Sequence, residues 1–172
     1  MSDEPVSMRV LSAAAPVSRQ RLWLTLLWYW GTVAAWMAVI SLLSTDAFSA
    51  TNTNRYIDPL LRWLFPGWAT PDILAAHTAV RKVAHFSEFF VLGGLVFWAS
   101  RRGRVEQWRA GWMLQALIIA GGYALLDEAH QAFVPSRTPS LSDSGVDFFG
   151  AVVSQLAVYR HHRRLRRRGV IG

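Results

Sequence analysis

The chain has 172 residues and no cysteine, 52% of its residues are hydrophobic, and its formal net charge is +7. The lack of cysteine excludes a disulfide framework, a thiolate metal site and a cysteine nucleophile. Apolar runs separated by tight clusters of charge are typical of an integral membrane protein, and this length leaves room for one domain.

The first predicted membrane span covers residues 22–43, which include no charged side chain. At about 1.5 Å per residue, this stretch crosses a hydrocarbon core of about 30 Å. A cleaved signal peptide is the alternative, but its apolar region is shorter than this one. We therefore expect an uncleaved helix that follows an N-terminal tail of residues 1–21.

The following segment, residues 44–81, is long for a loop and rich in Trp, Leu and Phe. This composition predicts a short helix that lies in the membrane interface and ends at Pro66. Thr70 and Pro71 then match a helix cap and a first-turn proline. We expect the second span to belong to a helix from Pro71 to about Ser100.

Two further apolar runs cover residues 110–126 and 146–159. The last run is the shortest and becomes long enough to span if its helix begins near Ser142. The predicted fold is therefore an all-α bundle of four transmembrane helices over residues 22–159, with a basic tail at 160–172. Three spans plus a half-buried helix is the alternative.

Most of the 18 basic residues precede the first span, separate the second span from the third, or follow the fourth. In a four-span bundle these positions lie on one side, which the positive-inside rule makes cytoplasmic. We expect a protein of the cytoplasmic membrane with both termini in the cytoplasm. A three-span bundle would put the basic tail outside.

A polar stripe runs along the second predicted span, where Lys82, His85 and Glu88 recur at every third residue. This spacing keeps the three side chains close to one face of a helix. Ionisable groups at such positions face the interior of a bundle, where another helix supplies partners.

Matching polar residues flank the outer ends of the third and fourth spans. Asp127, Glu128 and Gln131 share one helical face if the third helix continues past residue 126, and Asp143 and Asp147 are spaced i and i+4. Antiparallel packing puts these groups at the same membrane level. The predicted outer polar cluster comprises Lys82, His85, Glu88, Asp127, Glu128, Gln131, Arg137, Asp143 and Asp147.

Several roles for the outer polar cluster stay open at this point. Polar residues between membrane helices can serve as packing contacts alone, at about 0.6 kcal/mol each. Candidate catalytic residues are Glu88, Asp127, Glu128 and His85, since carboxylates and imidazole supply acid–base chemistry. His and carboxylate groups also suit a metal, but no zincin-type spacing is present, so we expect neither a metal nor a cofactor.

The sequence resembles the VanZ-like family of bacterial membrane proteins, which is associated with teicoplanin resistance. The segment RKVAHFSEFFVLG resembles the family signature Lys-x-x-His-Phe-x-Glu-Tyr/Phe, with Phe89 at the last position. The segment YALLDEAHQAFVPSRTPSLSDSGVDFFG resembles its Asp-Glu-x-x-Gln, Arg and Asp-x-x-x-Asp/Asn elements. Ser44, after the first span, also resembles a family feature.

The resemblance implies an envelope protein that influences teicoplanin susceptibility by binding or altering a cell-envelope component through the outer polar cluster. The alternatives are an enzyme that acts on a lipid-linked substrate and a small proton-coupled transporter. Expected partners are membrane lipids, with anionic lipid at the basic tail, and a cell-wall or lipid-linked ligand. Nucleic acid is not expected, because the basic residues flank apolar runs.

Overall fold

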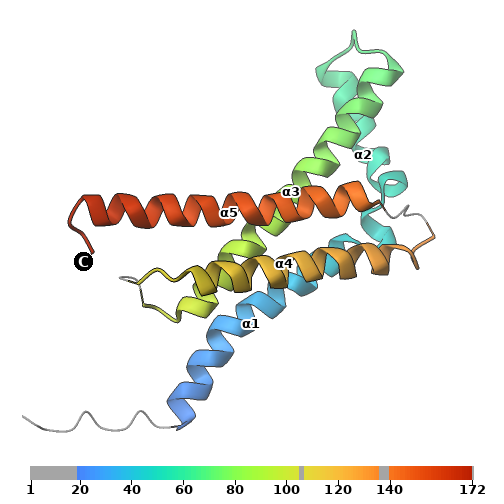
Figure 1. The fold of residues 1–172 in the computed structure, drawn as a ribbon. Helices are drawn as coiled ribbons and strands as arrows, with labels where there is room; N and C mark the ends of the chain where they lie inside the picture. Colours follow the sequence, from blue (N-terminus) through green and yellow to red (C-terminus); the bar gives the residue numbers. More distant parts are fainter. Residues whose placement is uncertain (1–18, 105–106, 136–139, 172) are drawn as a thin grey trace, which may run out of the picture.

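The computed structural model describes residues 19–104, 107–135 and 140–171, and these residues form helices and connecting turns without a strand (Figure 1). The elements in chain order are α1 (Arg19–Leu43), the 3-10 turn η2 (Asp46–Phe48), α2 (Ala50–Leu64), α3 (Thr70–Arg101), α4 (Ala110–Gln131) and α5 (Leu141–Arg167).

Helix α3 is the longest helix and packs against α1, α2, α4 and α5. Helices α4 and α5 lie side by side, and α2 follows the first part of α3 in a hairpin (Figure 1). The start of α5 and the end of α4 meet at one end of the bundle, near α2 (Figure 1). Buried polar residues of α3, α4 and α5 meet at this end.

Within the described residues, three helices are long and apolar enough to cross a membrane: Trp23–Leu43, Thr70–Arg101 and Ala110–Gln131. The prediction of three long apolar helices is confirmed, whereas the prediction of a fourth span is not. Helix α5 has a more polar composition because its buried face includes Asp147, Ser154 and Gln155. It also continues past residue 159 and carries the basic segment to Arg167.

The helix starts differ slightly from those predicted. Helix α3 is capped at Ala69 and not at Thr70, because the Asp72 carboxylate accepts a 2.9 Å hydrogen bond from the Ala69 N–H. Helix α5 begins at Leu141, one residue before the predicted start, and Ser140 is its cap residue. The helix expected in residues 44–81 is present as α2, and its exposed Tyr56 and Trp63 suit the predicted position in the interface.

The contact between α3 and α5 is close because small residues occupy both helices. A Cβ atom added to Gly93 would lie 3.2 Å from Ala151 Cα, and one added to Gly150 would collide with the Phe86 carbonyl oxygen. The Gln155 side chain donates a 2.9 Å hydrogen bond to the Gly93 carbonyl. This close approach fixes the register in which α5 presents its polar face to α3.

We expect Gly150→Ala to destabilise the bundle by about 1–3 kcal/mol, because the backbone of α3 must move to admit the methyl group. The midpoint of thermal unfolding in detergent, followed by circular dichroism, measures the loss. Gly122→Ala is the control, since nothing lies within 4 Å of a Cβ added there. Equal midpoints for the two variants would contradict the close α3–α5 contact.

Candidate functional site

The outer polar cluster is assembled from three helices. Five of its members are buried: His85 on α3, Asp127, Glu128 and Gln131 on α4, and Asp147 on α5. Glu88 and Asp143 are half-buried, and Lys82 is exposed. Arg137 lies outside the described residues. The structure therefore brings the described members together at one end of the bundle, with a buried centre and a wetter rim.

His85 and Asp147 join α3 to α5 at the centre of the cluster. His85 Nδ1 and Asp147 Oδ1 are 3.1 Å apart, and the Asp147 residue is fully buried. A carboxylate that binds one ring nitrogen fixes the tautomer and orientation of the imidazole. The pair therefore fixes the orientation of the His85 ring.

Asp127 joins α4 to the end of α1. Its Oδ2 atom accepts hydrogen bonds of 2.8 Å from the Ser44 hydroxyl and from the Gln131 amide. The continuation of α4 past residue 126 makes the second contact available, since Gln131 lies one helical turn after Asp127. The two donors satisfy the hydrogen-bonding capacity of this buried carboxylate oxygen.

Glu128 holds the start of α5. Its Oε2 atom accepts a 2.6 Å hydrogen bond from the backbone N–H of Ser140, the cap residue of α5. Because the last turn of α4 and the first turn of α5 share this contact, the carboxylates of both helices stay at one level. Glu128 is thus a positioning residue in this arrangement.

Sequence reasoning missed two interactions at the rim of the cluster. Arg81, which the predicted cluster did not include, forms a 3.0 Å ion pair with Asp143. His77 pairs with Asp58 between α3 and α2. The signal was available, because His77, Arg81 and His85 follow one another at i+4 spacing on α3.

A cavity of about 330 Å³ opens beside the cluster between the end of α1, α2 and α3. Its polar wall includes Arg81, Lys82, His85, Glu88 and Asp143. Its apolar lining includes Leu43, Ile57, Leu74 and Val80, which come from all three helices. The cavity therefore offers two cationic side chains and two carboxylates next to an apolar surface.

One group of buried side chains in the described part could hold a metal ion. His85, Asp127 and Asp147 each offer a ligand atom, and these atoms lie within 4.8 Å of one another. Several of the atoms already serve the protein contacts described above, since Asp147 binds His85 and Asp127 accepts two donors. The expectation that the site functions without a metal stays a prediction.

We expect His85→Leu to cost about 3–5 kcal/mol, because it leaves the Asp147 carboxylate buried without its imidazole partner. Replacing both residues by leucine should cost less than the sum of the two single replacements, with a coupling of about 0.5–3 kcal/mol. Unfolding titrations of the four proteins in mixed detergent micelles measure this cycle. Strict additivity would show that the two side chains do not interact.

The comparisons with known proteins agree with the arrangement of these motifs. The family model described as VanZ/LLP1 matches residues 22–161, which is most of the chain. Neither the curated proteins nor the solved structures include a match. The matched range begins in the first turn of α1, includes α2, α3 and α4, and ends at residue 161 of α5. The chain therefore belongs to the VanZ/LLP1 family and is a VanZ-like membrane protein.

Proposed function

We propose that this protein binds an anionic, lipid-linked component of the bacterial envelope in the cavity beside the outer polar cluster. By binding this component, the protein changes the susceptibility of the cell to teicoplanin. The single observation that carries the proposal is that the cavity sets the cationic side chains of Arg81 and Lys82 beside an apolar wall. Family membership supports the link to the glycopeptide.

The chemistry of the cavity supports an amphipathic ligand. Ligand sites combine a mostly apolar lining with a few polar groups that fix orientation. The arginine and lysine side chains suit a phosphate or carboxylate, and the ion pair with Asp143 holds the Arg81 guanidinium at the rim. The apolar wall suits the first part of a lipid chain.

The proposal includes a four-span topology with the cluster outside the cytoplasm. Helix α5 has 27 residues, which at about 1.5 Å each exceed a hydrocarbon core of about 30 Å. In the apolar part of α5, Asp147, Ser154 and Gln155 are buried inside the bundle, whereas Phe148, Phe149 and Leu156 are exposed. A lipid-facing surface of this kind supports α5 as the fourth span, with its arginines at the cytoplasmic end.

Acid–base catalysis on a lipid-linked substrate is the second candidate function. It is supported by His85, which lines the cavity while Asp147 holds its Nδ1 atom. A base oriented by a buried carboxylate is a recurrent catalytic arrangement. Chemical change of the bound lipid during incubation, followed by mass spectrometry, would favour this candidate over binding alone.

We expect Lys82→Gln and Arg81→Gln to abolish the decrease in teicoplanin susceptibility that the wild-type protein confers on a sensitive bacterial host. Both changes remove a positive charge from the cavity wall and keep hydrogen-bonding capacity. The minimal inhibitory concentration and the amount of each protein in the membrane are measured together. Lys82 is exposed, so its replacement leaves the packing of the bundle intact.

Arg62→Gln is the matched control, because Arg62 is an exposed arginine on neighbouring α2 that does not line the cavity. It should retain the wild-type phenotype. If cavity variants of normal abundance protect the host as well as wild type does, the cavity is not the binding site.

A further inference from the structure

A second polar region lies at the opposite end of the bundle, where the α3–α4 connection approaches the last turns of α5. A cavity of about 620 Å³ there is lined by Trp108, Arg109, Tyr159, His162, Arg163 and Arg166, together with Gln107. None of these described lining residues is acidic. The region is therefore cationic and aromatic, and it is separate from the cavity beside the outer polar cluster.

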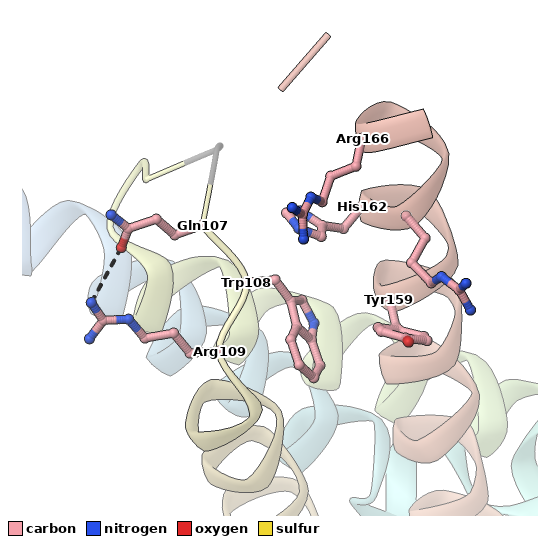
Figure 2. A pocket seen from close by; sticks show the side chains of 7 residues that line it. Gln107, Trp108, Arg109, Tyr159, His162 and Arg166 are labelled. Atoms are coloured by element: carbon pink, nitrogen blue, oxygen red, sulfur yellow. Dashed lines mark hydrogen bonds between the residues drawn. The ribbon is translucent and has the colours of Figure 1, made fainter. Parts of the chain in front are cut away.

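The side chains of this region differ in where they point. Figure 2 shows Arg166 and His162 close together on α5, facing the connection that carries Trp108. Arg109 turns away and donates a 3.4 Å hydrogen bond to the Gln107 side chain (Figure 2). Arg163 lies over the Tyr159 ring, with its guanidinium carbon 5.7 Å from the ring centre. Arg166 and His162 are thus the groups that face the cavity.

Positive charge is concentrated around His162. Burial lowers the pKa of His162, and the neighbouring charges of Arg166, Arg101 and His161 lower it further. The Nε atom of Arg101 on α3 is buried and has no acceptor among the described residues. A group of cationic donors from two helices, with no acid among the described lining residues, is suited to an anion with several acceptor oxygens.

An apolar groove continues directly from the cationic cavity. It has a volume of about 380 Å³, runs between α3 and α5, and shares Gln107, Trp108 and His162 with the cationic cavity. Its apolar lining includes Gly94, Phe97, Ala157, Val158 and Leu165. The rings of Trp108 and Tyr159 pack at a tilt near the junction, with their centres 5.2 Å apart. Tryptophan and tyrosine at such a junction are typical of the membrane–water interface.

We propose that the cationic cavity and the apolar groove together bind one anionic phospholipid. The phosphate lies at His162 between Arg166 and Arg101, and an acyl chain lies in the groove between α3 and α5. Charge complementarity selects an anionic headgroup, since basic residues near a membrane surface attract anionic lipid. The groove distinguishes this site from a simple phosphate site, because a free anion would leave the apolar surface uncovered.

The test uses the full-length protein in detergent and measures the binding of phosphatidylglycerol and phosphatidylcholine by native mass spectrometry. We expect phosphatidylglycerol to bind more tightly, with one lipid per protein. Arg166→Gln should weaken that binding roughly tenfold or more, because it removes a hydrogen bond to a charged group. Equal binding of the two lipids by the wild-type protein would overturn the proposal.

Arg167→Gln is the matched control. It removes the same charge from the adjacent position of α5, and Arg167 is exposed and lines neither cavity. A general attraction between lipid and the basic segment would make the two variants equal, and this result would overturn a defined site.

Two further arms distinguish a phospholipid from free phosphate. Ala157→Trp fills the groove from its exposed side and should weaken phosphatidylglycerol binding without changing the thermal midpoint of the protein. An excess of inorganic phosphate should fail to displace the lipid. If phosphate displaces the lipid and Ala157→Trp binds it normally, the site recognises a phosphate group alone and the phospholipid proposal is wrong.

Discussion

A charged or amide side chain buried among membrane helices costs free energy unless another group of the bundle binds it. In this protein Asp127 receives donors from α1 and α4, Asp147 pairs with His85 on α3, and Glu128 holds the start of α5. These contacts require four helices to meet at one level. The polar groups therefore determine the depth and rotation of the helices at this end, and the apolar core alone does not.

The same requirement explains the composition of α5. Its buried face carries Asp147, Ser154 and Gln155, and its exposed face carries Phe148 and Phe149. The polar residues lower its average hydropathy, yet Gly150 allows α5 to approach α3 closely enough to satisfy them. The average hydropathy of the whole helix does not distinguish its buried face from its exposed face. Helix α5 is therefore the element on which both the assembly of the cluster and the topology depend.

Much of this arrangement could be predicted from the sequence, because hydrophobic runs and residue spacing are local signals. The three long apolar helices, the helix at residues 44–81 and the continuation of α4 to Gln131 all follow from such signals. Which side chains touch depends on the rotation of one helix against another, which spacing within a single helix does not determine. Sequence spacing therefore identified His85 and Asp147 as members of the cluster without showing that they pair, and it did not identify Arg81 as the partner of Asp143. The basic segment after residue 159 was expected as a tail, but it is helical because arginine is a good helix former.

The decisive measurement is whether the two ends of α5 lie on opposite sides of the membrane. Single introduced cysteines can show this, because the chain has no native cysteine. Cysteines at Phe133, Gln107 and Val170 are each labelled with a membrane-impermeant maleimide in intact and in permeabilised bacteria. A four-span topology predicts that F133C is labelled in intact cells, and that Q107C and V170C are labelled only after permeabilisation. Labelling of V170C in intact cells would mean that α5 does not return across the membrane, and would contradict the four-span topology.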